Sequence, residues 1–523
     1  MRRRASRLPR EPQVEASTEA AAESRPGSAY PASRDSRLVL TAVTCVLLPV
    51  MVTMDTTVVN VAQRTFIADF STTQAVVAWT QTAYTLSLAA VIPLTGWAAN
   101  RSGTKRLVLG SVLLFSLGSL LCALASNIAL LVAFRALQGL GGGMLTPLQL
   151  IILARAAGPQ RLGRVLTLSM VPILMAPMCG PILGGWLIDS FGWQWIFLIN
   201  IPIGLLTMVL AGFVLPQDVP LPTESLDVIS MLLLSPGLVL LLYGVSLLPA
   251  RGTIADPFVW VPVAAGTVLI GAFVIHALRW TDRALIDLHL LEHRAVAAAN
   301  ATRFLFAVAF FGSLLLFPAY FQQVLGKTPL ESGLFLVPQT ASAAVAIPIV
   351  GRLMERRGPR RAALIGTALT AMGLAVFVYG MSREHVDLLV LLAGLAMFGV
   401  GTGGLMTPVT WAAIHTLDSS EVAHGSTLFN VNHNTAASVG AALMSVIVTS
   451  RFNANATITA AKRADSIREE AASRAYAGVF VVSMIVVAAT AIPAWFLPNR
   501  AAPPAAGRAW QGRPRAHPRG GPR

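Results

Sequence analysis

Four polar or ionisable side chains lie deep within long apolar runs of this sequence: Asp55, Arg135, Gln138 and His433. A charge at the centre of a bilayer costs at least about 2.5–3.5 kcal/mol on insertion scales, so it persists there by pairing, by facing water or by exchanging a proton. A carboxyl whose pKa is raised by burial can exchange a proton near neutral pH. These residue types therefore indicate proton-binding chemistry inside a membrane.

Asp55 is the leading candidate because it is the only acid deep within the apolar runs of the N-terminal half. Intramembrane ionisable groups are functional by default, which favours proton coupling. The alternative is a packing role, in which the carboxylate accepts hydrogen bonds from the nearby hydroxyls of Thr53, Thr56 and Thr57.

Arg135 and His433 raise the same question in other apolar runs. A guanidinium keeps its charge, so Arg135 needs a partner or water; the alternative is that its long side chain reaches the outer interface. Gln138 is three residues further on and shares its helix face. His433 is a candidate second protonation site, because an unperturbed imidazole titrates at about 6.5; the alternative is a hydrogen bond within the protein.

The composition places these residues in a membrane protein. The chain has 523 residues, 55% hydrophobic and 12% charged, whereas an ordinary soluble domain has about 25% charged residues. The net charge of +15 is divided among short segments between apolar runs and the two ends of the chain, so it predicts no nucleic-acid partner. Residues 1–37 lack the apolar core of a signal peptide.

Fourteen segments are long and apolar enough to cross the hydrocarbon core, which takes about 20 helical residues. We expect them near residues 38–62, 75–98, 106–126, 128–154, 164–188, 194–215, 227–247, 258–278, 297–322, 331–351, 361–381, 386–411, 425–450 and 475–497. This topology places 29 Lys and Arg on the side of the termini and 9 on the other. Positive residues accumulate inside, so both termini are expected in the cytoplasm and the protein in the plasma membrane.

Two basic turns 255 positions apart have similar sequences: GWAANRSGTKR (96–106) and GRLMERRGPRR (351–361). The matched residues are Gly96, Asn100, Arg101, Gly103 and Arg106, and Gly351, Glu355, Arg356, Gly358 and Arg361. Glycines permit tight turns between helices, and arginines anchor a turn at the anionic inner surface. A gating role and a plain topology signal explain the turns equally well.

The repeat predicts two pseudo-symmetric six-helix bundles in the same orientation, joined by a central helix pair. The expected parts are a disordered tail, a bundle, the pair with its linkers, a second bundle and a second disordered tail. Their residues are 1–37, 38–215, 216–280, 281–498 and 499–523. The position of the pair suits a linker or a lipid-facing brace.

The fifth expected span contains GPILGG, with Gly180, Pro181, Gly184 and Gly185. Small residues four apart let helices approach closely, and proline bends a span. We expect a tight, kinked seam between the two bundles. Adaptable and polar side chains are candidates for a broad substrate cavity; the alternative, favoured for most of the aromatic and methionine side chains, is packing against lipid. The candidate cavity residues are Met54, Met175, Phe311, Tyr320, Gln322, Asn430 and Asn434.

The motifs resemble those of the major facilitator superfamily, and of its fourteen-spanner EmrB/QacA-type drug:proton antiporters. The segments that resemble the family are MDTTVVNVA (54–62), GWAANRSGTKR (96–106), RALQGLGGG (135–143) and GPILGGW (180–186). The resemblance covers residues 40–498. It implies a proton-relay role for Arg135 near Asp55 and an antiporter role for the fifth-span motif. Asn100 departs from the acid usual in the family, which implies a weaker latch between gating states.

The resemblance implies an all-α transporter that exports amphipathic small molecules, cationic ones among them, in exchange for protons by alternating access. It implies no cofactor, metal or enzymatic activity, and we find no HExxH, GxSxG or P-loop motif. Its partners would be substrate, protons and the bilayer; a periplasmic or outer-envelope partner is left open. Export of an endogenous lipid or metabolite is the alternative, and a non-transporting sensor is less favoured.

Overall fold

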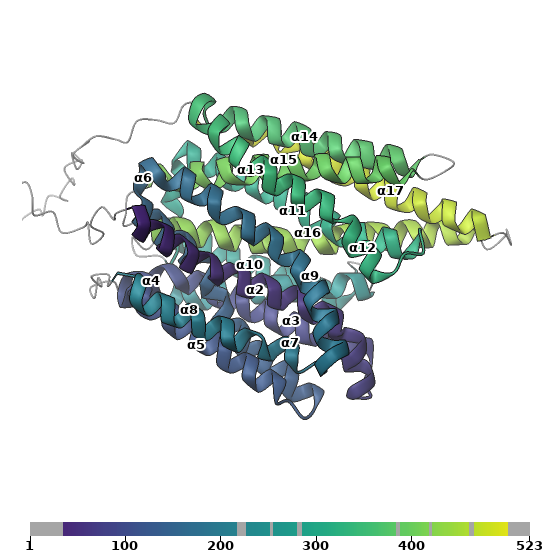
Figure 1. The fold of residues 1–523 in the computed structure, drawn as a ribbon, viewed down its shortest axis with the longest axis horizontal. Coiled ribbons are helices and arrows are strands. Elements are labelled where there is room, and N and C mark those ends of the chain that lie inside the picture. The colour runs from purple at the N-terminus through teal and green to yellow at the C-terminus, as the bar shows by residue number, and fades with distance from the viewer. Residues whose placement is uncertain are drawn as a thin grey trace, which may run out of the picture.

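The structure is a computed structural model that describes residues 35–216, 226–251, 255–279, 285–382, 387–417, 421–459 and 465–499. Within these residues every regular element is a helix (Figure 1). The N-terminal half contains α2 (Asp35–Asp69), α3 (Gln74–Val91), η1 (Ile92–Leu94), α4 (Thr95–Ser102), α5 (Thr104–Ala123), α6 (Ile128–Phe191), α7 (Trp195–Leu198) and α8 (Asn200–Val214). The helix pair is α9 (Val228–Arg251) and α10 (Pro257–Arg279). The C-terminal half contains η2 (Leu288–Glu292), α11 (Arg294–Gln323), α12 (Pro329–Phe335), α13 (Val337–Arg357), α14 (Pro359–Met381), α15 (Leu388–Ile414), α16 (Val422–Thr459), α17 (Asp465–Ala489) and α18 (Ala491–Ala494).

Twelve helical segments of the described chain are long and apolar enough to cross a membrane. They coincide with twelve of the fourteen expected spans. The other two expected spans, 164–188 and 425–450, lie on the second part of α6 and on α16. The chain is therefore an all-helical, multi-pass membrane protein.

The two repeated turns have the same backbone geometry. Gly103 separates α4 from α5 with φ 84° and ψ 147°, and Gly358 separates α13 from α14 with φ 83° and ψ 161°. Positive φ favours glycine because a Cβ atom is strained there. The two glycines thus end one helix and start the next without a loop. We call the side of the molecule on which they lie the turn side.

Gly158 marks the change of direction inside α6. The sequence predicts two spans here, joined by a short basic segment, and the helix is continuous in hydrogen bonding except for the non-helical angles of Gly158, φ 63° and ψ 172°. One residue with positive φ is enough to turn the chain. The segment 451–474 lies between the last two expected spans; it is helical up to Thr459 and again from Asp465, and residues 460–464 lie outside the described chain.

The helix pair lies against both halves. α9 packs on α10 and also contacts α3 of the N-terminal half and α16 of the C-terminal half. The rings of Trp79 on α3 and Tyr243 on α9 are 5.8 Å apart, and Leu234 and Leu238 of α9 pack near Leu428 of α16. The description as a linker or lipid-facing brace is therefore incomplete, because α9 connects the halves while α10 carries many exposed apolar side chains.

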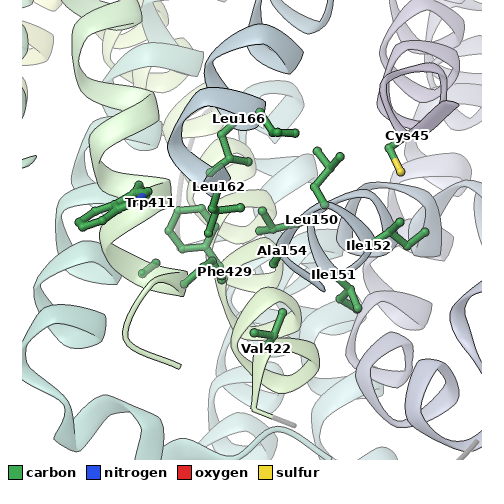
Figure 2. Packing of buried hydrophobic residues seen from close by; sticks show 14 of the residues in the cluster. Cys45, Leu150, Ile151, Ile152, Ala154, Leu162, Leu166, Trp411, Val422 and Phe429 are labelled. Carbon is green, nitrogen blue, oxygen red and sulfur yellow. The ribbon is translucent and has the colours of Figure 1, made fainter. Parts of the chain in front are cut away.

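On the turn side the two halves share one apolar core (Figure 2). Leu162 and Leu166 of α6 lie beside Trp411 of α15 and Phe429 of α16. A Cβ atom on Gly163 would lie 3.4 Å from the Trp411 ring, so backbone and ring are in close contact. These contacts close the turn side of the molecule between the halves.

Candidate functional site

Asp55 and Arg135 form a buried ion pair between α2 and α6. Arg135 Nη1 lies 2.5 Å from Asp55 Oδ2, and neither side chain is exposed. The residues are 80 positions apart in sequence, so the pair exists because α2 packs along α6. Arg135 Nε also donates to the Thr80 carbonyl on α3 at 3.3 Å. A desolvated charge is tolerated here because its partner compensates it.

Gln138, Asn200 and Ser119 complete a network around the carboxylate. Gln138 Nε2 and Asn200 Nδ2 both donate to Asp55 Oδ1, at 2.8 and 3.0 Å. The same two amides contact Ser119 Oγ at 2.5 and 3.0 Å, and Arg135 Nη1 donates to Gln138 Oε1 at 2.6 Å. Four helices, α2, α5, α6 and α8, each supply a member. Both carboxylate oxygens are thus occupied by donors.

The guanidinium also lies against aromatic rings. Arg135 Cζ is 4.0 Å from the centre of the Tyr84 ring and 5.8 Å from that of Phe197, within cation–π range. Arg135 Nη2 and Asn200 Oδ1 are buried without a hydrogen-bond partner among the described atoms, which is costly. A proton on Asp55 would compete with Arg135 for the same carboxylate, so this arrangement can link proton binding to a rearrangement of the helices.

The structure contradicts the expected hydroxyl contacts of Thr56 and Thr57 and the interfacial position of Arg135. The hydroxyls of Thr56 and Thr57 donate to the carbonyls of Val52 and Thr53, at 2.9 and 3.1 Å. These hydroxyls donate to carbonyls of their own helix and not to the Asp55 carboxylate, as threonines in helices commonly do. Arg135 does not extend to an interface, because its side chain is fully buried beside its acid.

Sequence reasoning missed Asn200 and Ser119. Asn200 could have been found, since it is an isolated amide in the apolar run IFLINIPIG. Polar groups buried within a membrane span usually have a functional role. Ser119 carries no such signal, because a serine in a helix can bond its own backbone. Only the packing of α5 against α6 and α8 identifies it.

The glycines of the repeated turns pack against the opposite half. A Cβ atom on Gly96 of α4 would lie 3.0 Å from Thr427 Oγ1 and 3.1 Å from the Ala423 carbonyl, both on α16. A Cβ atom on Gly351 of α13 would lie 2.9 Å from Thr167 Oγ1 on α6. The two positions related by the repeat thus both make close helix contacts across the halves.

Asn100, which stands where the family usually has an acid, forms a hydrogen bond with the cationic side chain of Arg155. Its Oδ1 accepts a hydrogen bond from Arg155 Nη2 at 2.8 Å, and its side chain is buried. An acid at this position would form an ion pair with Arg155. The asparagine keeps the hydrogen bond to Arg155 but brings no negative charge. The side chain of Glu355 lies outside the described part of the chain. The four matched arginines of the turns are exposed: Arg101, Arg106, Arg356 and Arg361.

The tight seam of the fifth-span motif lies within the N-terminal half, and the expectation of a seam between the bundles is corrected accordingly. A Cβ atom on Gly180 would collide with Thr57 of α2, and one on Gly184 would lie 3.1 Å from Val58 Cγ1. Gly185 has open space around it. The side chain of Pro181 lies outside the described part. The motif therefore holds α6 against the helix that carries Asp55.

His433 belongs to the other half of the molecule. It lies on α16, where its ring is 5.2 Å from that of Phe311 on α11. Its Nδ1 is buried and has no hydrogen-bond partner among the described atoms. The structure thus brings Asp55, Arg135 and Gln138 together and places His433 apart from them.

The expected cavity residues differ in burial within the described part of the chain. Met54 is buried in the apolar core of the N-terminal half, whereas Met175 is 48% exposed and Gln322 is exposed. Tyr320 is fully buried among aromatic rings, 5.9 Å from that of Phe377. These four side chains thus occupy different environments.

The remaining candidates lie on α11 and α16. Asn430 and Asn434 donate to the carbonyls of Ser426 and Asn430 on their own helix, both at 2.9 Å, and Phe311 contacts His433. An apolar groove of about 440 Å³ lies between α13 and α15. It contains none of the predicted cavity residues.

Comparison with known proteins identifies relatives over most of the chain. The sequence profile of the Major Facilitator Superfamily matches residues 45–293 and 299–519. A multidrug resistance protein B homolog of Mycobacterium tuberculosis is 49% identical over 498 residues, covering 90% of this chain and 92% of its own. The multidrug export protein EmrB of Haemophilus influenzae is 31% identical over 426 residues, covering 79% and 81%.

A solved structure supports the fold. The proton:xylose symporter XylE superposes with a TM-score of 0.58 at 13% sequence identity, over 87% of this chain and 95% of its own. At this identity the likeness concerns the path of the helices alone.

Proposed function

The chain belongs to the major facilitator superfamily, and from that premise we propose that it is a multidrug efflux transporter that exports amphipathic small molecules in exchange for protons. The names of the M. tuberculosis and H. influenzae relatives support the multidrug class. The observation that carries proton coupling is the buried ion pair of Asp55 with Arg135. Gln138 and Asn200 donate hydrogen bonds to the other oxygen of the same carboxylate.

Competition for one carboxylate is the basis of the coupling. In the ionised state Asp55 holds Arg135 and two amides. A proton on Asp55 removes the compensation of the buried Arg135 charge, which is costly unless the guanidinium finds water or another acceptor. Protonation therefore favours a conformation in which α2 and α6 separate and water enters. Return to the ionised pair releases the proton and closes the site.

Alternating access would act through the contacts on the turn side. In this structure Gly96 and Gly351 seal that side against α16 and α6. Rocking of the halves would break these contacts and open the site to the cytoplasm. The seam of Gly180 against Thr57 connects this movement to the helix that carries Asp55.

The same proposal includes the finer topology. Fourteen spans, made of two pseudo-symmetric six-helix halves and the central pair, would place both termini in the cytoplasm and the protein in the plasma membrane. The excess of Lys and Arg on that side supports this orientation, and the matching glycine angles of the two turns support the internal repeat.

Inverted membrane vesicles with an imposed proton gradient test the function. We expect ethidium uptake and ethidium-induced proton release in the wild type, and loss of both in Asp55→Asn, because the amide cannot carry a proton. Asp189→Asn is the matched control, since Asp189 lies on α6 and is exposed. It should behave as the wild type.

Retention of gradient-driven uptake by Asp55→Asn would contradict the coupling role. Wild-type vesicles that move neither ethidium nor protons would remove the multidrug assignment and favour an endogenous lipid or metabolite as substrate. A comparison of the lipids of a deletion strain would then identify that substrate.

A further inference from the structure

Arg303 is a second cation within a predicted span. It is the tenth residue of α11, which places it about 13 Å along the helix from its start on the turn side. The positive-inside count includes Arg303 among the 29 basic residues of the cytoplasmic side, although the expected span 297–322 contains it. The structure puts its side chain, partly buried, between α11, α15 and α16. A guanidinium at this position keeps its charge.

The partners of Arg303 are all uncharged. Its Nη1 lies 3.2 Å from Met406 Sδ and 3.3 Å from Thr410 Oγ1 on α15. Its Cζ is 4.6 Å from the centre of the Phe429 ring. Its Nε is buried without a hydrogen-bond partner among the described atoms. No carboxylate of the described residues forms an ion pair with it, in contrast to Arg135.

His433 lies beside this cation. It is the twelfth residue of α16, so it lies at a similar depth, about 16 Å from a helix start on the same side. Phe429, whose ring contacts the Arg303 guanidinium, lies one helical turn before His433 on α16. Asn432, the residue before His433, donates from Nδ2 to the carbonyl of Asn300 at 2.8 Å. Asn300 lies about one turn before Arg303 on α11, so this bond holds α11 and α16 together beside the two side chains.

Arg303 Nε and His433 Nδ1 are both buried without a hydrogen-bond partner among the described atoms, so the two side chains have capacity to bind a polar ligand. A buried cation is tolerated when a counter-charge compensates it, and a planar guanidinium matches a carboxylate best. Aromatic rings flank the pair on both sides, with Phe429 at the guanidinium and Phe311 at the imidazole. Both Arg303 and His433 keep partial exposure, which allows a ligand to reach them.

We propose that Arg303 and His433 form a binding site for the carboxylate of an amphipathic substrate, whose apolar part contacts Phe311 and Phe429. This inference rests on the proposed export function and names a substrate class for it. The N-terminal half then holds the proton-binding acid, and the C-terminal half holds the group that recognises an acidic ligand.

Two dyes that differ in one group test the site. Tetramethylrhodamine carries a free carboxylate, and its methyl ester lacks it. Fluorescence anisotropy with the purified full-length protein in detergent would measure the Kd of each. We expect Arg303→Gln to weaken binding of the carboxylate dye about tenfold or more, from the loss of a charge-assisted hydrogen bond, and to leave the ester unchanged. Arg303→Lys should bind the carboxylate dye with a Kd between those of the wild type and Arg303→Gln. Lysine keeps the positive charge but lacks the paired donors of a planar guanidinium.

Arg251→Gln is the matched control, because it removes one positive charge from an exposed position on α9. Selective loss of the carboxylate dye in Arg303→Gln, with Arg251→Gln unchanged, supports the site. Equal loss of both dyes, no loss of either, or no binding of the carboxylate dye to the wild type overturns it. Transport of the ester by wild-type vesicles tests the export function separately, so the two failures are distinguishable.

Discussion

At the scale of single residues, two arginines within the helices differ: Arg135 is fully buried and Arg303 is partly buried. Arg135 has its acid 2.5 Å away and two amides that share the same carboxylate. Arg303 has a thioether, a hydroxyl and an aromatic ring. The free energy of a buried charge depends on its compensation, so the first arginine is part of a closed network, whereas the second has capacity left for a ligand.

The stability of the Asp55–Arg135 pair can be predicted. Asp55→Asn should lower the free energy of unfolding by about 3–5 kcal/mol, because it leaves a buried guanidinium without compensation. Asp55→Asn combined with Arg135→Gln should be more stable than Asp55→Asn alone, since no charge is then left unpaired. Thermal unfolding of the purified variants measures this order.

Neither variant should transport protons, because both lack the Asp55 carboxylate. A difference in stability between them can therefore be measured apart from proton coupling. A double variant less stable than Asp55→Asn would contradict the account of the ion pair.

At the scale of helices, glycine determines how closely α6 approaches α2. A Cβ atom at Gly180 would overlap Thr57, and one at Gly185 would meet nothing within 4 Å. The two glycines are five residues apart in one motif, and their different surroundings follow from the helical rotation between them. The motif is thus a contact surface on one face of α6 only.

Gly180→Ala should destabilise the protein by about 1–3 kcal/mol, as overpacking does. Gly185→Ala should be neutral or stabilising by up to about 1 kcal/mol, because alanine favours a helix over glycine. Thermal unfolding of the two variants, side by side, checks the difference. Equal unfolding temperatures would mean that α2 and α6 do not meet at Gly180.

At the scale of the whole molecule, the two halves meet through the helices that precede the repeated turns. Gly96 of α4 rests on α16, and Gly351 of α13 rests on α6. The apolar core around Trp411 and Leu162 extends across the same boundary (Figure 2). The turn side is closed here, so movement of the halves must break these contacts first.

A disulfide can test that movement. The ideal Cβ position of Gly351 is 3.6 Å from Thr167 Cβ, within the range of about 3.5–4.5 Å for disulfides. We expect the Thr167→Cys, Gly351→Cys pair to cross-link on oxidation, to stop ethidium transport, and to recover activity on reduction. Each single cysteine variant is the control.

Full transport by the oxidised, cross-linked protein would show that the halves need not separate on the turn side.

The sequence by itself determined the properties that depend on local chemistry. Hydrophobic runs predicted the membrane class and positioned the twelve spans that the structure confirms. Glycine and basic residues predicted two turns of one design, since positive φ is a property of single residues. Residue type alone marked Asp55, Arg135 and Gln138 as unusual in apolar runs.

Only the tertiary structure decided which of these residues meet. Asp55 and Arg135 are 80 positions apart, and Asn200 joins them from α8. The partner of Gly180 is α2 and not the opposite bundle, and the partners of Arg303 are on α15 and α16. The physical reason is that a contact between helices depends on their relative rotation and packing, which no local sequence pattern specifies.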